Sequence, residues 1–215
     1  MERIADILLV MLGWALGAIT PGITEAIQKP KRRAEILSAL RTELTELRYK
    51  LALVAHNMRG RTGSMTSTTA ALVNPILLGF RGDARDTEFQ ETFSKLLAVS
   101  EEQYFALQNR RKGQGSPYPV RYGTPFLESQ LQNVGLFPPA TQERILRVRS
   151  EFHLFNEQVD QARMFHDRTY TLTGPNHSAN DGNYETSLEK LAYRAEATIR
   201  TINALLGDDG NAPAR

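Results

Sequence analysis

The chain has 215 residues, with 26 Lys and Arg against 24 Asp and Glu, so its formal net charge is only +2 at pH 7. A balance this even does not provide the basic surface that nucleic-acid binding requires, so we expect no nucleic-acid partner. The sequence contains no cysteine, which excludes disulfides, thiolate metal ligands and a thiol nucleophile. This composition is compatible with a reducing compartment.

An uncharged and mostly apolar stretch occupies residues 7–24 near the N-terminus. A basic cluster follows it, made of Lys29, Lys31, Arg32 and Arg33. At about 1.5 Å of rise per residue, a helix over this stretch spans most of the ~30 Å hydrocarbon core of a bilayer. Because basic residues favour the cytoplasmic side, the pattern predicts a single-pass inner-membrane protein with its N-terminus outside and its body in the cytoplasm. Residues 1–28 are then a transmembrane anchor in the lipid bilayer, and the basic cluster contacts anionic headgroups.

Two other interpretations of the apolar stretch stay open. A cleaved signal peptide normally begins with positive charge, whereas Glu2 and Asp6 here outnumber Arg3. The stretch could also be a helix buried within the domain that follows.

The predicted anchor carries two further features. Gly13 and Gly17 form a GxxxG motif, which allows two helices to approach closely in lipid and therefore predicts membrane self-association and a homo-oligomer. Pro21 and Gly22 lie near the expected inner boundary of the span, where they predict a kink that turns the chain toward the next helix.

Three long runs of apolar residues recur at spacings of three and four, the pattern of amphipathic helices. The first run is Leu37, Leu40, Leu44, Leu47, Leu51, Val54 and Met58, and Gly60 and Gly63 end it. The second is Ile145, Val148, Phe152, Phe155, Val159, Ala162 and His166. The third, after Asp181 and Gly182, is Leu188, Leu191, Ala195, Thr198, Ile202 and Leu205. We expect an all-α fold in which residues 29–207 form an antiparallel helical bundle with shorter connecting helices, and residues 208–215 a disordered tail.

Heptad-patterned runs can also join two chains as a coiled coil. In a parallel homodimer of the first run, Glu43 would face Arg48 of the other chain, but no other flanking pair is clearly complementary. We therefore favour packing within one chain over pairing between chains.

The segment between the first two runs predicts short helices and loops. Residues 69–80 are apolar but contain Pro75, and Phe89, Phe93, Leu96 and Leu97 suggest a second short helix. Ser100 and Gln103 have the spacing of a capping box at the start of a third. Residues 112–125 and 174–183 are expected to be loops, since the first is rich in glycine and proline and the second is polar.

Large aromatic side chains mark one of these loops. Tyr118, Tyr122 and Phe126 alternate with Arg121 and prolines. Such a loop either packs onto its own domain or binds a partner protein, and we favour packing because ordered loops of this size are usually held by their own large side chains.

The strongest catalytic hypothesis concerns Arg147 and His153. Their spacing, Arg followed six residues later by His, resembles the signature of HEPN ribonucleases, which are small helical bundles that act as dimers. The resemblance covers seven residues and implies that Arg147 binds phosphate while His153 transfers a proton. Arg149 lies one helical turn from His153 and would share its face better. The alternative is that all three side chains are solvated residues beside the apolar run.

Metal and cofactor motifs are absent from the sequence, so we expect neither. No histidine has the Glu-x-x-His spacing of di-iron bundles, and the pair His153 and Glu157 supplies only two ligands. The sequence as a whole therefore predicts a membrane-anchored helical scaffold, adaptor or oligomeric membrane effector, with an unidentified protein partner. The alternatives are a membrane-tethered HEPN-like ribonuclease that uses Arg147 or Arg149 with His153, and a pore-forming assembly.

Overall fold

The computed structural model describes the backbone of residues 2–80, 84–113 and 118–207. Within the helices it leaves out the side chains of residues 2–10, 12, 13, 15–27, 84–87, 89 and 109. The described residues form seven α-helices and one 3-10 helix, with no strand among them. The helices are α1 (Glu2–Thr62), α2 (Ser67–Gly79), α3 (Ala84–Leu97), α4 (Glu101–Arg110), α5 (Pro125–Gln130), η1 (Leu131–Leu136), α6 (Pro139–Thr169) and α7 (Pro175–Gly207). The prediction of an all-helical fold is confirmed, and the predicted tail at residues 208–215 lies outside the described residues.

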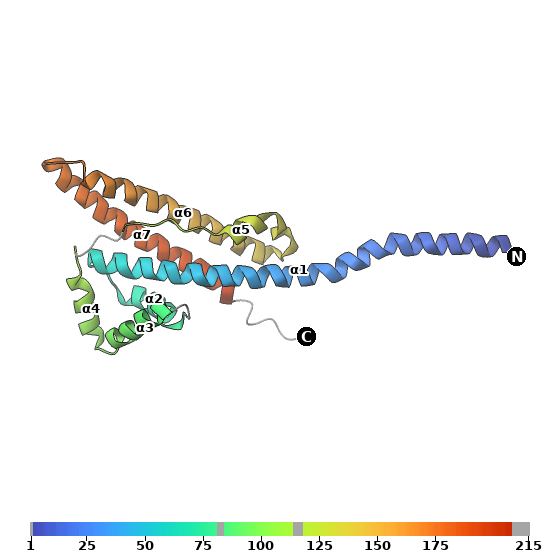
Figure 1. The fold of residues 1–215 in the computed structure, drawn as a ribbon, viewed down its shortest axis with the longest axis horizontal. Coiled ribbons are helices and arrows are strands. Elements are labelled where there is room, and N and C mark those ends of the chain that lie inside the picture. The colour runs from blue at the N-terminus through green and yellow to red at the C-terminus, as the bar shows by residue number, and fades with distance from the viewer. Residues whose placement is uncertain (1, 81–83, 114–117, 208–215) are drawn as a thin grey trace.

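Helix α1 is the dominant element, with 61 residues and a length of about 90 Å. It runs through Pro21 and Pro30 and across the boundary expected between residues 28 and 29. Its C-terminal half packs in the bundle, while its N-terminal half projects away alone, after a bend near the point of exit (Figure 1). Each proline removes one backbone hydrogen bond from the helix, which accounts for bending without a break.

The predicted anchor lies in this projecting half. The structure describes the helical backbone there but few of the side chains. In the part of the chain whose residues are described, no helix is long and apolar enough to cross a membrane.

Three long helices make the core of the bundle. Helix α7 lies between α1 and α6 and runs antiparallel to both, so α1 and α6 point in the same direction (Figure 1). The three predicted runs supply the core: every residue of the third run is buried, as are all of the second except His166 and all of the first except Leu37 and Val54. Helix α1 ends at Thr62, and Gly63 takes a positive φ of 67°, as the glycines of the first run suggested.

Helix α7 begins earlier than the sequence suggested. Residues 174–183 were expected to be a loop, but the helix starts at Pro175, directly after Gly174 in a left-handed conformation with φ of 62°. Proline is favoured at the first position of a helix because its missing N–H has no partner there. The buried Asn180 side chain then donates from Nδ2 to the Phe165 carbonyl (2.9 Å) and to Thr169 Oγ1 (3.1 Å), which attaches the first turns of α7 to the end of α6.

Helices α2, α3 and α4 form a smaller layer against α1 (Figure 1). The predicted capping box is confirmed at α4, where Gln103 N donates to Ser100 Oγ (3.2 Å) and Ser100 N donates to Gln103 Oε1 (3.3 Å). Helix α4 approaches α1 closely at Gly60, where a Cβ atom would lie 3.1 Å from Gln108 Oε1. An alanine at this crossing would require the end of the Gln108 side chain to move by a few tenths of an ångström.

A short segment that the sequence did not predict, α5 with η1, covers the side of the bundle opposite this layer. Glu43 on α1 holds this segment in place. Its carboxylate accepts hydrogen bonds from the backbone N–H groups of Phe126 and Leu127, both at 2.8 Å. Thr124, the residue before α5, makes no capping hydrogen bond of its own. Glu43 therefore supplies from a distant helix the cap that α5 lacks, because a carboxylate is stabilised by the positive end of the helix dipole.

Candidate functional site

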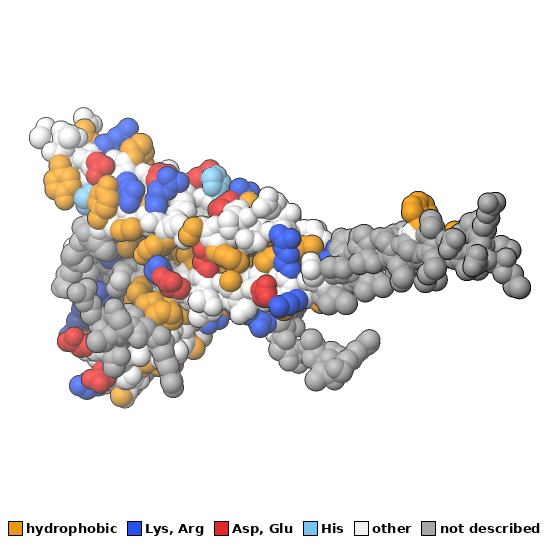
Figure 2. All heavy atoms as spheres, turned by 45° about the vertical axis from the view of Figure 1, so that its right-hand side comes forward, with side chains coloured by type: hydrophobic (Ala, Val, Ile, Leu, Met, Phe, Trp, Pro, Cys, Tyr) orange, Lys and Arg blue, Asp and Glu red, His pale blue; other side chains and the backbone are white. Residues whose placement is uncertain are grey.

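The basic cluster lies where α1 leaves the bundle. Lys29, Lys31, Arg32 and Arg33 are all exposed. Arg32 Nη2 donates to Asn133 Oδ1 (3.1 Å), and the Arg33 guanidinium lies 5.9 Å from the centre of the Phe137 ring. Figure 2 shows Lys and Arg side chains gathered at the base of the projecting helix. The segment around η1 therefore holds part of the cluster at the end of the bundle from which α1 projects.

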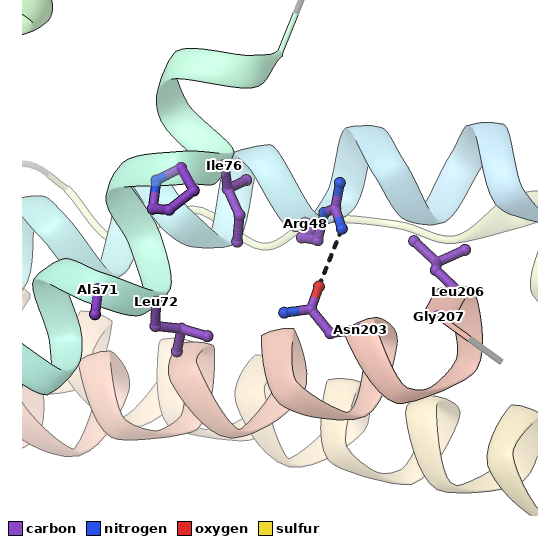
Figure 3. Close-up of a pocket in the computed structure, with 8 residues that line it drawn as sticks. Arg48, Ala71, Leu72, Ile76, Asn203, Leu206 and Gly207 are labelled. Atoms are coloured by element: carbon purple, nitrogen blue, oxygen red, sulfur yellow. Dashed lines mark hydrogen bonds between the residues drawn. The ribbon is translucent and has the colours of Figure 1, made fainter. Parts of the chain in front are cut away.

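A groove of about 480 Å³ opens farther along α1, between α1, α2 and the end of α7 (Figure 3). We call it the Arg48 groove. Its apolar walls are Ala71, Leu72, Pro75, Ile76 and Leu206. Arg48 and Asn203 are its polar side chains, and Gly207, the last residue of α7, lies at its edge. Most pockets that bind small ligands or peptide side chains have this composition of an apolar lining with few polar groups.

Arg48 lacks a countercharge among the described residues. Its Nη1 donates to the neutral Asn203 Oδ1 at 3.0 Å, and its Nε is buried without a hydrogen-bond partner. Burial lowers the pKa of the Arg48 guanidinium from its ordinary value, because the surroundings solvate the charge poorly. A guanidinium with donors left over in an apolar groove favours a carboxylate or phosphate ligand, since such anions accept several of its N–H groups at once.

A buried ion pair fixes the helices that shape this groove. Glu196 on α7 is only 4% exposed, and its Oε1 accepts from Arg59 Nε on α1 (2.8 Å) and from Thr69 Oγ1 on α2 (3.1 Å). One carboxylate therefore joins three helices. Helix α2 carries most of the apolar wall of the Arg48 groove. The hydrogen bond from Thr69 to Glu196 therefore fixes the position of this wall relative to α7.

The residues of the HEPN-like hypothesis are all exposed on α6, but they do not share one side of it. Arg149 Nε lies 3.2 Å from both carboxylate oxygens of Glu128, and His153 Nε2 lies 3.3 Å from Glu157 Oε1. Arg147 is exposed and borders a shallow cavity with Arg144 and Arg200 instead. Arg149 and His153 are therefore each engaged by a different carboxylate at the surface. Within one chain the structure does not bring Arg147 and His153 to a common cleft.

The aromatic loop packs onto its own domain, as we favoured. The Tyr122 ring stacks on Phe155 at 6.3 Å, and the backbone of Tyr122 exchanges two hydrogen bonds with the side chain of Asn156, at 3.1 and 3.3 Å. Arg163 Nε donates to the Pro119 carbonyl at 2.7 Å. Tyr118 contacts His166 edge-on at 5.0 Å, so the loop follows α6 over much of its length.

His56 is the most completely buried histidine among the described residues, with 3% exposure. Its Nδ1 has no hydrogen-bond partner, and its ring meets Phe93 edge-on at 5.1 Å. Burial first, and the nearby positive charge of Arg111 second, lower the pKa of His56 to about 4. His56 is therefore a neutral core residue near neutral pH.

Metal chemistry finds no support in the part of the chain that the structure describes, where no three His, Cys, Asp or Glu side chains come together in a way that could hold a metal ion. Comparison with family models, with curated proteins and with solved structures finds no match to this chain.

Sequence reasoning missed the Arg48 groove. It treated Arg48 only as a flanking residue of the first apolar run, since a helical pattern does not show which distant residue will face a given side chain. One signal was available in the sequence. Arg48 lies next to Leu47 and Tyr49 and close to Leu51, and a charged residue is unusual on a stretch of helix that is buried on several sides.

Proposed function

We propose that this protein is a membrane-anchored helical scaffold whose bundle is held at the inner face of the membrane by α1. The observation that carries the proposal is the continuity of α1. One helix leads from the apolar stretch at residues 7–24, past the basic cluster, into the core of the bundle. No loop separates the two parts, so an anchor in lipid would also orient the bundle.

The projecting half of α1 has the length and order of parts that this role requires. About 18 apolar residues come first, the basic cluster follows at the end of the bundle, and the buried positions begin at Ile36. Each lysine or arginine near an anionic surface contributes roughly 1 kcal/mol of attraction at low salt. The cluster would therefore hold the near end of the bundle against the headgroups.

Self-association in lipid belongs to the same proposal. Gly13 and Gly17 lie one turn apart, so that their backbones form a flat surface on which a second copy of α1 packs. Glu43, which a coiled coil through the first run would pair with Arg48 of the other chain, accepts the Phe126 and Leu127 amides within the chain. The proposal therefore assigns oligomerisation to the projecting half of α1.

A fractionation experiment tests the anchor. The full-length protein is expressed in bacterial cells, and its membrane fraction is washed with alkaline carbonate. We expect the protein to stay in the membrane pellet. The double variant Leu12→Arg/Leu16→Arg, near the middle of the apolar stretch, should move largely to the soluble fraction, since each arginine costs about 3 kcal/mol at the centre of a span.

The matched control is Leu12→Ile/Leu16→Ile, which keeps the stretch apolar and should behave as the unchanged protein. Recovery of the unchanged full-length protein in the soluble fraction, with its N-terminus intact by mass spectrometry, would refute the anchor. Oligomerisation is read separately from the detergent-extracted mass, which Gly13→Ile/Gly17→Ile should reduce to that of a monomer.

A further inference from the structure

We propose that the Arg48 groove is the docking site of the chain's own C-terminal segment, residues 208–215, with Asp208 or Asp209 supplying the carboxylate that Arg48 lacks. This inference does not depend on the membrane anchor. It rests on three observations: the uncompensated charge in the groove, the point at which α7 ends, and the sequence that follows.

The first observation is the state of Arg48. Among the described residues its only hydrogen-bond acceptor is the neutral Asn203 Oδ1, and its buried Nε donor has no partner. Two other partly buried arginines face carboxylates, since Arg59 lies 2.8 Å from Glu196 and Arg194 lies 3.7 Å from Glu151, whereas Arg163 donates to the Pro119 carbonyl. A buried donor on a charged group is costly to leave unsatisfied, so the groove is suited to an anionic occupant.

The second observation is where the chain goes next. Gly207 ends α7 and itself lines the groove (Figure 3). Because consecutive Cα atoms are about 3.8 Å apart, residues 208 and 209 start within roughly 8 Å of the groove edge.

The third observation is the sequence of the segment, Asp-Asp-Gly-Asn-Ala-Pro-Ala-Arg. Its two carboxylates come first, directly after Gly207, which lines the groove together with Arg48. Gly210 permits a tight turn, and Ala212, Pro213 and Ala214 are small apolar residues that match walls built from Ala71, Pro75 and Ile76. Charge and apolar contact therefore occur in the same order on the segment and on the groove.

The absence of native cysteine makes a direct distance measurement possible. Spin labels are attached to the full-length protein in detergent at Asn211→Cys, a position that the proposal gives no contact, and at Thr68→Cys, an exposed position on α2. Pulsed electron resonance should give a narrow distance distribution if the segment is docked. In Asp208→Asn/Asp209→Asn the ratio of docked to undocked molecules should fall roughly tenfold, the effect of losing a charge-assisted hydrogen bond.

Arg48→Gln should produce the same broadening, while the control Arg110→Gln, an exposed arginine that does not line the groove, should leave the distribution narrow. The aspartate variants keep the test decisive if Arg48→Gln fails to fold, because they lie outside the bundle. A broad distribution in the labelled parent protein would overturn the proposal, as would a narrow one that the asparagine substitutions leave unchanged. A signal that disappears on dilution with unlabelled protein would assign the segment to a second copy and would also overturn it.

Discussion

The two halves of α1 belong to one helix but face different surroundings. From Ile36 onward the helix has a buried face, and Leu44, Leu51, Ala52 and Ala55 have no exposed area at all. In the projecting half, the described side chains of Met11 and Trp14 are 65% and 82% exposed. The comparison shows that apolar residues alone do not determine packing. In the sequence, residues 7–24 of the first half carry no charge, whereas the second half alternates buried apolar and exposed polar residues and has helices of its own chain against its buried side.

The largest expected effect is a difference in unfolding free energy between a variant in the packed half and a variant in the projecting half. Leu51→Ala removes a fully buried side chain from the packed half and should lower the free energy of unfolding by about 4 kcal/mol, since the vacated volume cannot refill. Met11→Ala in the projecting half should change it by less than about 0.5 kcal/mol. Urea unfolding of the full-length protein in detergent, followed by circular dichroism, measures both. Equal losses in the two variants would mean that Met11 in the projecting half is also packed in the folded protein.

The next effect concerns pH and the packed half alone. The pKa of His56 is lowered to about 4 in the folded protein, below its ordinary value of 6.5. Between these values the unfolded chain binds a proton that the folded one does not, so stability falls as the pH drops from 6.5 toward 4. The total loss should be roughly 3 kcal/mol, and no contribution is expected above pH 6.5.

His56→Gln serves as the comparison because it removes the titration and keeps a polar side chain. Its stability should depend less steeply on pH between 6.5 and 4 than that of the unchanged protein, as measured by urea unfolding at half-unit intervals. Parallel pH profiles for the two proteins would show that His56 is not held neutral by burial.

A smaller effect is expected where the packed half holds α5. Glu43→Gln keeps the shape of the side chain but removes its charge and one of its two acceptors, so the Phe126 and Leu127 amides lose a charge-assisted contact. We expect a loss of about 2 kcal/mol and faster amide hydrogen exchange in α5 and η1. Glu46→Gln, whose carboxylate pairs only with the exposed Lys50, is the control and should cost less than about 0.5 kcal/mol. Unchanged exchange in α5 would contradict the capping role.

The smallest expected effect lies outside the comparison, on α6. His153→Ala should leave the stability and any RNA-cleaving background of the purified protein unchanged, because the His153 side chain is 72% exposed and pairs with an exposed carboxylate, that of Glu157. Incubation of both proteins with a labelled RNA checks this. Cleavage by the unchanged protein that the substitution abolishes would instead support the HEPN-like hypothesis and point to a site formed between chains.

The sequence predicted the long helices well because their periodicity reflects burial directly. Phe152, Phe155 and Val159 are buried for the same reason that they recur at spacings of three and four. The capping box at Ser100 and Gln103 was predictable because it is a contact between near neighbours in the sequence.

Features that depend on distant residues could not be predicted in this way. The cap of α5 comes from Glu43, more than eighty residues earlier. The start of α7 is held in place because Asn180, on α7, donates a hydrogen bond to Phe165 near the end of α6. The polar composition around Asn180 suggested a loop, but tertiary hydrogen bonds outweighed that local preference. For the same reason the Arg48 groove, which three separate helices build, left almost no trace in the sequence.

The unbroken course of α1 has a mechanical consequence. A helix without a flexible joint transmits rotation along its axis, so a turn of the N-terminal half about that axis would carry the whole bundle round with it. We expect α1 to bend most easily at Pro21 and Pro30, because a proline inside a helix cannot donate the usual backbone hydrogen bond. Bending at these two positions therefore limits how much rotation α1 transmits from its N-terminal half to the bundle.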